Sequence, residues 1–282
     1  MKTANPHTME WQTFSAHRSG SDAVTKDYLR FKRLLRGEEG SARNFELTLA
    51  QAIGSPPIPR HRHNFDQIRY GISGTYSFRE GMPMGPGDLS YFPEGAYYGP
   101  ETAVGDPVML VVQFGGANDF GFMSMDQVKD GAERLRRTGS FESGVFRWKD
   151  STGNVAEKDG YEAVWDEVIR TQLLYPEPRY TDPILIKPSS FRWRPVMAGV
   201  DLMSLGSFTE RRTEFARLRL SAGAFYRLPP DDRTTLIFLA DGNIQADTYE
   251  MGCHHAIQIE PTRPLALSAH GSAELLLIRL PA

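Results

Sequence analysis

The sequence has a single cysteine, no long apolar run and no excess of charge of one sign. Cys253 alone cannot form an intrachain disulfide or a cysteine-based zinc cluster. No stretch reaches the ~20 apolar residues of a membrane span, and the first twelve residues, MKTANPHTMEWQ, lack the apolar segment of a secretory signal. Thirty-two Lys and Arg are scattered among 35 Asp and Glu, so no basic surface for nucleic acid or anionic lipid is indicated. We therefore expect a cytoplasmic protein that has neither nucleic acid nor membrane as a partner.

Glycine and proline, by contrast, are abundant and spread along the whole chain. The 26 Gly and 19 Pro divide the 282 residues into short segments, and 40% hydrophobic residues are enough to bury a core. The segments with strand character in the first part of the chain are 45–53, 66–72, 75–79, 89–93 and 108–114. Short strands separated by turn signals predict an all-β sandwich or barrel.

The pattern changes after Phe122. Ser124 and Gln127 have the spacing of a capping box, which predicts a helix that ends at Gly139, and a second helical pattern covers 161–170. A proline-rich segment, 175–195, is expected to be an extended strap across the interface between two barrels. Strand patterns return after Gly206, at 215–220, 235–239, 243–248, 256–259 and 274–280. We predict a barrel over 1–123, a partly helical connector over 124–195 and a second barrel over 196–282.

The most informative segment is PRHRHNFDQIRYGISG, residues 59–74. In an extended chain, alternate side chains share a face, so His61, His63, Gln67 and Arg69 point the same way unless a bulge intervenes. Two imidazoles at this spacing can hold one metal ion, with a later side chain as a third donor. The alternative is a pair of buried, hydrogen-bonded histidines in a former metal site.

These residues resemble the first motif of the cupin superfamily, with Gln67 where that motif ordinarily has Glu. The segment GDLSYFPEGAYY, residues 87–98, resembles the second motif, with Tyr98 in place of its metal-binding His. The resemblance implies an all-β fold of two cupin barrels, of the double-stranded β-helix or jelly-roll type. In the second half, the positions that match the two histidines and the glutamine are Pro229, Asp231 and Thr235, so the C-terminal barrel is expected to be degenerate and without metal.

The resemblance also implies a site in the N-terminal barrel. Its metal ligands would be His61, His63, Gln67 and Tyr98, holding Fe²⁺, Mn²⁺ or Ni²⁺, and the departures at Gln67 and Tyr98 leave open a site without metal. Arg69 would clamp an anionic oxygen or form a salt bridge with a neighbouring strand, and Tyr98 would be a proton donor. Gln113 reaches the site if it points inward, although a surface position is the default for such a residue. The expected catalytic residues are Tyr98 and Arg69, and the expected substrate contacts are Arg69, Tyr76, Tyr91 and Gln113.

Three functions follow from this site. The first is a metal-dependent enzyme, of dioxygenase type, that acts on a small carbonyl, enol or aromatic compound. The second is an isomerase, lyase or dehydratase, metal-free or metal-assisted, that uses His and Tyr as an acid–base pair, and the third is a non-catalytic protein that binds a small molecule. Two barrels in one chain can replace a dimer of single barrels, so a monomer and a homodimer are both open.

Overall fold

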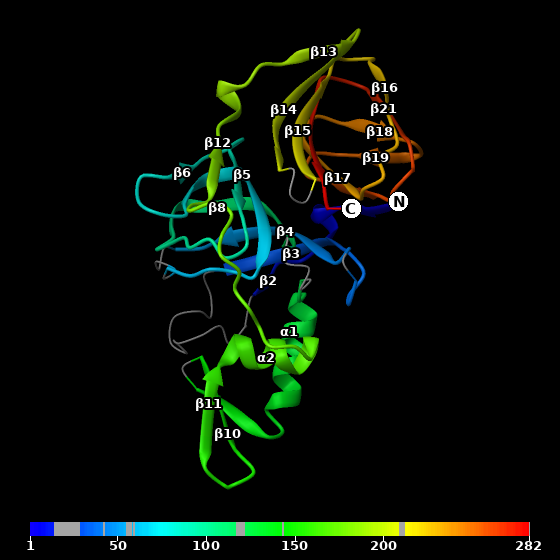
Figure 1. The fold of residues 1–282 in the computed structure, drawn as a ribbon. Helices are drawn as coiled ribbons and strands as arrows, with labels where there is room; N and C mark the ends of the chain where they lie inside the picture. The colour runs from blue at the N-terminus through cyan, green and yellow to red at the C-terminus, as the bar shows by residue number, and fades with distance from the viewer. Residues whose placement is uncertain are drawn as a thin grey trace.

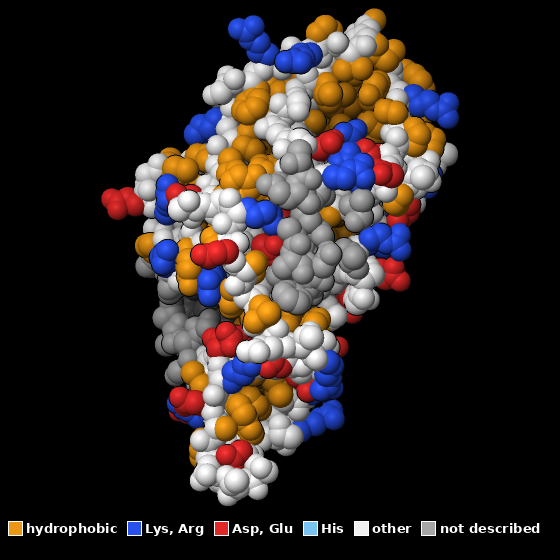
Figure 2. Space-filling view, in the orientation of Figure 1, with side chains coloured by type: hydrophobic (Ala, Val, Ile, Leu, Met, Phe, Trp, Pro, Cys, Tyr) orange, Lys and Arg blue, Asp and Glu red, His pale blue; other side chains and the backbone are white. Residues whose placement is uncertain are grey.

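The computed structural model describes residues 1–13, 29–41, 43–54, 58, 60–116, 122–142, 144–208 and 212–281. In Figure 1 the described chain forms two β-barrels, one above the other, and a helical connector below the N-terminal barrel. No helix in the described ranges is long and apolar enough to cross a membrane. In Figure 2, acidic and basic side chains are interspersed on the visible face, so no field of one sign covers it.

The N-terminal barrel is built on an eight-stranded sheet of described residues. Its strands are β2 (Gln12–Thr13), β3 (Leu29–Arg36), β4 (Phe45–Ala52), β5 (Phe65–Ser77), β6 (Pro83–Met84), β7 (Leu89–Phe92), β8 (Thr102–Gly115) and β12 (Ile184–Ile186). The order is β12-β7-β5-β8-β4-β3-β2, with β6 paired to β5. The two strand segments predicted at 66–72 and 75–79 are one strand, because β5 continues through register shifts near Gly71 and Ser73.

The C-terminal barrel consists of a larger and a smaller sheet in the described ranges. The larger contains β1 (Lys2–Ala4), β13 (Arg194–Met197), β14 (Val200–Phe208), β15 (Thr213–Leu220), β17 (Thr235–Asp241), β20 (Ala256–Ile259) and β22 (Ala273–Arg279). The smaller contains β16 (Phe225–Leu228), β18 (Ile244–Ala246), β19 (Tyr249–Met251) and β21 (Leu265–Ala269). β1 pairs with β20, and β12 pairs with β7, so each barrel includes a strand from outside its own segment of the chain.

The connector has the two helices that the sequence predicts. α1 (Met125–Leu135) begins with the capping box of Ser124 and Gln127, and α2 (Gly160–Ile169) packs beside it. Between the helices lies a sheet of β9 (Gly139–Glu142), β10 (Val145–Lys149) and β11 (Val155–Asp159). β11 alternates exposed with half-buried residues and carries no apolar pattern that would reveal it in the sequence.

One apolar core joins the two barrels. It takes alternate residues of β4, β5 and β8, among them Leu47, Ile68 and Val112, and packs them against Phe215 and Phe238 of the C-terminal barrel. The strap crosses this junction as predicted, since the Tyr180 ring lies 6.5 Å from Tyr91 and 6.0 Å from Phe208. Because one face of the N-terminal sheet is committed to the second barrel, its other face is the one that can enclose a cavity.

Candidate functional site

The candidate site lies on the face of the N-terminal sheet that points away from the second barrel. On β5, Ile68 and Tyr70 enter the shared core, while Gln67 and Arg69 line a cavity of about 140 Å³. The same alternation places Met109, Val111 and Gln113 of β8 on the cavity. Polar residues in otherwise apolar strands therefore mark the inside of the barrel.

His61 and His63 also line this cavity, just before β5 begins. The backbone of His61 is paired with that of Tyr98, by N–H···O bonds of 2.9 and 3.0 Å, and the His63 carbonyl accepts from Gly95 at 2.7 Å. Their imidazole centroids lie 5.1 Å apart, and the His63 ring stacks on Phe65 at 4.4 Å. The backbone thus fixes two histidine side chains side by side on one wall.

Arg69 is the centre of a buried polar network next to the histidines. Its Nε donates to the Gln67 amide oxygen, and its Nη1 donates to Glu101 at 2.6 Å. Three aromatic rings surround the guanidinium, with centroids 4.5 Å (Phe92), 5.2 Å (Tyr76) and 5.3 Å (Tyr98) from Cζ. Arg69 therefore forms the salt bridge that was one of its two predicted roles, and it still lines the cavity.

Glu101 is the residue of this network that the sequence did not reveal. Its carboxylate is 2% exposed and accepts from Arg69 and from the Tyr76 hydroxyl. Burial raises the pKa of Tyr76 well above its usual value, and the neighbouring Glu101 raises it further, so Tyr76 stays a neutral donor. Glu101 lies in an irregular segment before β8, where no strand periodicity assigns a face. Its only signal is a lone acidic residue in the stretch YYGPETAV.

Two of the four predicted metal ligands have their oxygens engaged by Arg69. The Gln67 amide oxygen accepts from Nε, and the Tyr98 hydroxyl accepts from Nη2 at 3.4 Å. Tyr98 packs with Phe78 and Phe92 behind the cavity wall rather than on it. The structure thus brings the four residues together, but the Tyr98 hydroxyl is directed to Arg69.

Tyr91 must be removed from the set of substrate contacts. It pairs with Ile68 across β5 and β7, so it shares the face of Ile68 and lies in the core between the barrels. Its hydroxyl donates to Asp66 at 2.7 Å and accepts from Arg179 at 2.8 Å. Gln113 shares the inward face with its cross-strand neighbour Gln67, so the inward alternative is the one the structure shows.

The two imidazoles pass a geometric test for a shared metal ion. With a metal–nitrogen bond of about 2.1 Å and tetrahedral angles, ring centroids on one ion are separated by about 5.2 Å. The observed centroid separation is 5.1 Å. In the described part of the chain, no three His, Cys, Asp or Glu side chains gather around one point, so protein donors alone would not close the coordination shell. The residues fit an open site, in which two positions or more belong to water and substrate.

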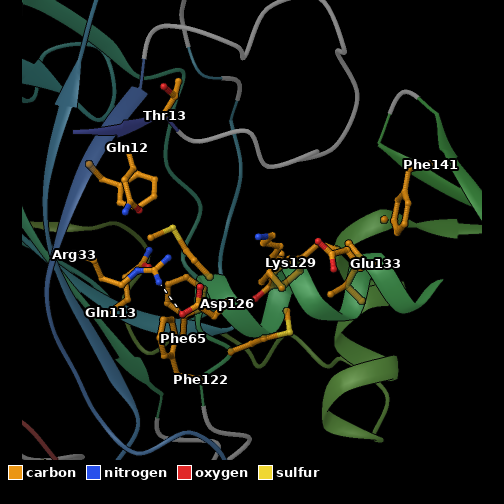
Figure 3. Close-up of a pocket in the computed structure, with 18 of the residues that line it drawn as sticks. Gln12, Thr13, Arg33, Phe65, Gln113, Phe122, Asp126, Lys129, Glu133 and Phe141 are labelled. Atoms are coloured by element: carbon orange, nitrogen blue, oxygen red, sulfur yellow. Dashed lines mark hydrogen bonds and ion pairs between the residues drawn. The ribbon is translucent and has the colours of Figure 1, made fainter. Parts of the chain in front are cut away.

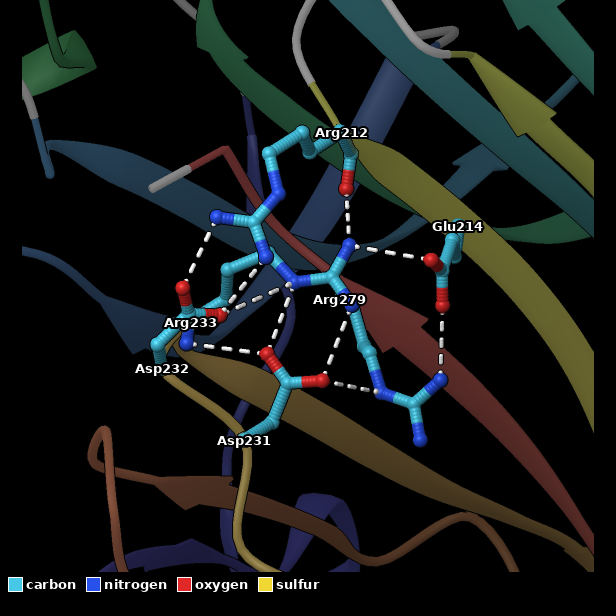
Figure 4. A network of polar contacts seen from close by, with 6 residues as sticks. All are labelled: Arg212, Glu214, Asp231, Asp232, Arg233 and Arg279. Atoms are coloured by element: carbon cyan, nitrogen blue, oxygen red, sulfur yellow. Dashed lines mark hydrogen bonds and ion pairs between the residues drawn. The ribbon is translucent and has the colours of Figure 1, made fainter.

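The C-terminal barrel carries a different arrangement at the matching positions. Its interior is filled by a cluster of aliphatic side chains that includes Leu218, Ile237 and Leu275. Asp231, which matches the second histidine, belongs instead to an ion-pair network with Arg233, Arg279 and their neighbours (Figure 4). This end of the barrel is organised by charge pairs.

The network makes the stability of the protein depend on pH. Hydrogen bonds from Arg233 lower the pKa of Asp231 to about 2, below its unfolded value, so the network stabilises the fold above pH ~4 and this contribution is lost as the pH falls toward about 2. We expect Asp231→Asn to lower the free energy of unfolding by about 1 kcal/mol at pH 7, after allowance for solvent screening. Urea unfolding from pH 7 to pH 2 should show this difference vanishing in acid. Asp232→Asn, in the same network but more exposed, is the control, and an equal loss in both variants would contradict the assignment.

The comparisons with known proteins agree with this fold. No protein-family model and no curated protein matches the chain. Among solved structures, a candidate dioxygenase from Nostoc punctiforme aligns with a TM-score of 0.65 and 11% identity, over 99% of this chain and 81% of that one. HEPD from Streptomyces albus, with 2-hydroxyethylphosphonate and Fe(II) bound, gives 0.56 and 12%, over 100% and 78%. A variant of Bacillus subtilis oxalate decarboxylase gives 0.54 and 13%, over 90% and 73%. The chain has the all-β cupin fold that the two motifs predict.

Proposed function

We propose that the chain is a metal-dependent cupin enzyme that acts on a small organic molecule through carbonyl, enol or aromatic-ring oxygens. The observation that carries the proposal is the pair of imidazoles, His61 and His63, at the separation of two ligands on one ion beside a buried cation. A divalent ion held there would act as a Lewis acid on a substrate oxygen. Fe²⁺, Mn²⁺ and Ni²⁺ all suit imidazole ligands.

The protein's own residues would bind the substrate and stabilise negative charge on it. Arg69 makes one strong bond to Glu101, while its Nη2 makes only a 3.4 Å contact with Tyr98, so Nη2 has donor capacity for an oxygen in the cavity. The three surrounding rings keep water away and hold the guanidinium plane in place. In this low-dielectric site, a fixed cation stabilises developing charge more strongly than it would in water.

A dioxygenase-type reaction is the proposed chemistry. It is supported by the names of solved structures with this fold, which include a candidate dioxygenase and an Fe(II)-bound HEPD. The open coordination positions beside the two histidines leave room for a small substrate and a second reactant. Gln67, with a second lone pair on its amide oxygen, can add a third protein ligand.

A metal-free isomerase, lyase or dehydratase is the second candidate. It is favoured by the engagement of the Gln67 and Tyr98 oxygens with Arg69, which weakens both as metal ligands, since each oxygen already accepts a hydrogen bond from a cation. In that case, His61 or His63 would move a proton at the substrate, and Arg69 would stabilise the resulting anion. Tyr98 would be the proton donor, because its hydroxyl only accepts from Arg69 and keeps its own O–H for donation.

Metal content separates the two candidates. We expect protein purified without chelator and dialysed against Fe²⁺, Mn²⁺ or Ni²⁺ to retain close to one ion per chain, because two imidazoles provide the anchoring bonds. His61→Ala should lower metal affinity by about 10-fold or more. His255→Ala removes a histidine outside the site and should leave affinity unchanged. Elemental analysis that finds no bound metal in the wild type would rule out the first candidate and leave the second.

A further inference from the structure

A second cavity, of about 590 Å³, lies between the N-terminal barrel and the helical connector. Figure 3 shows Arg33, Phe65 and Gln113 on its barrel side and Lys129 and Glu133 on its helix side. The barrel cavity with the histidines is only about 140 Å³, which holds a few non-hydrogen atoms. The second cavity is in the range of about 300–1,000 Å³ that is typical of sites for drug-sized molecules.

The walls of this second cavity are fixed to each other by partly buried polar contacts. At the start of α1, the backbone N–H of Met125 donates to Glu46 of β4 at 3.1 Å. Arg33 of β3 lies 2.7 Å from both Glu46 and Asp126, and so ties α1 to the sheet. These contacts fix the position of α1 relative to the barrel at one end of the cavity, and so define the space between them.

The lining is apolar in depth and charged at the rim. Val128 and Ala132, four residues apart on α1, line the cavity and pack on the apolar cluster between α1 and α2. Five aromatic side chains also line the cavity: Phe31, Phe65, Phe122, Phe141 and Tyr161. On the helix side, Lys129, Glu133 and Arg136 are exposed, whereas Asp126 is half-buried and neutralised by its pair with Arg33. Such a surface suits an apolar body rather than a phosphate or a sugar.

The two cavities share a wall. Phe31, Gln113 and Met125 line both of them. Phe65 lines the larger one, and the His63 ring stacks on Phe65 at 4.4 Å. The two cavities therefore adjoin, so the space under α1 is available to the remainder of a molecule whose polar end lies beside His63.

We propose that the cavity under α1 binds the apolar body of the ligand whose oxygen-bearing head group enters the barrel. The substrate class is then an aromatic or branched aliphatic compound with one compact carbonyl or enol end, too large for the barrel alone. The assignment of the head group depends on the proposed function, whereas the assignment of the apolar body depends only on the cavity. The connector is thus a specificity element rather than a spacer between barrels.

The apolar site is tested with 8-anilinonaphthalene-1-sulfonate and the full-length protein. We expect one probe per chain, with enhanced and blue-shifted fluorescence.

Ala132→Trp fills the cavity and should weaken binding by about 10-fold or more, because it displaces the buried apolar area of one ring. Lys129→Trp, at the exposed rim, tests the same space if the first variant folds poorly. Asp130→Trp, on the next residue but outside the lining, is the matched control and should bind like the wild type. Absent binding, or equal binding by all variants, would overturn the proposal.

The connection to the barrel is tested with two hydroxamates that share a metal-chelating head. On metal-loaded protein, 2-naphthohydroxamate should bind about 10-fold or more tightly than acetohydroxamate, and Ala132→Trp should abolish this preference. His61→Ala should weaken both hydroxamates while leaving the fluorescent probe bound, which separates failure of the metal site from failure of the cavity. Equal affinities of the two hydroxamates, or a preference that survives Ala132→Trp, would show that the cavities do not act together.

Discussion

Replacing Arg69 by methionine is expected to lower the free energy of unfolding by about 3–5 kcal/mol, because it leaves a buried carboxylate without its cation. Glu101 is 2% exposed, and its strong charged partner is Arg69 at 2.6 Å. The remaining contact, from the Tyr76 hydroxyl, is a neutral hydrogen bond and cannot replace a full charge. Urea denaturation followed by circular dichroism measures the change.

The Arg69 prediction has a rescue variant and a matched control. Glu101→Gln added to Arg69→Met removes the uncompensated charge and should recover a large part of the loss, since the coupling belongs to the pair. Arg79→Met breaks a half-exposed ion pair with Asp182, and should cost about 1 kcal/mol at most. If Arg69→Met is no more destabilising than Arg79→Met, the buried network does not organise the site.

Arg179→Met is expected to have an effect of similar size, about 3–5 kcal/mol, because one guanidinium serves two buried carboxylates. Nη2 lies 3.1 Å from Asp66, and Nη1 lies 3.1 Å from Glu94. Burial raises the pKa of Asp66 despite the opposing effect of Arg179, so the Asp66 carboxylate already lies in an unfavourable environment for charge. Removing Arg179 also takes away the ion pairs between the first part of the strap and the barrel, while the pairing of β12 with β7 remains.

Lys187→Met gives the control on the same strap. Lys187 pairs with Asp88 at 2.7 Å but is 47% exposed, so its loss should cost about 1 kcal/mol or less. Asp66→Asn combined with Arg179→Met should restore part of the stability, because one buried charge is removed. Chemical denaturation that gives equal losses for Lys187→Met and Arg179→Met would contradict the structural role of the buried cluster.

The sequence predicted the cupin fold, and most of the residues that it singled out line the barrel cavity, because both depend on local patterns. Alternation along β5 placed Gln67 and Arg69 on one face, and both line the cavity. The sequence left the face of Gln113 open, with the surface as the default, and the structure places its side chain on the cavity. The capping box at Ser124 located the start of α1 to the residue.

The features that the sequence did not predict depend on contacts between distant segments of the chain. The alternation of side chains along β7 separates its two faces but does not say which face meets the second barrel. Tyr91 was therefore predicted on the cavity face, whereas it lies in the core between the barrels. Glu101 follows no strand period, and its partnership with Arg69 spans 32 residues. The cavity under α1 arises where the connector packs on β3 and β4, and no single segment encodes it.

The most direct measurement is an anomalous difference map from a crystal of the wild-type protein soaked in Mn²⁺. We predict one strong peak inside the N-terminal barrel, about 2.1 Å from a ring nitrogen of His61 and of His63. The same soak of His61→Ala crystals should lose that peak. A peak elsewhere, for example near the neighbouring rings of His7, His254 and His255 on the C-terminal barrel, or no peak between His61 and His63, would contradict the metal site on which the proposed function rests.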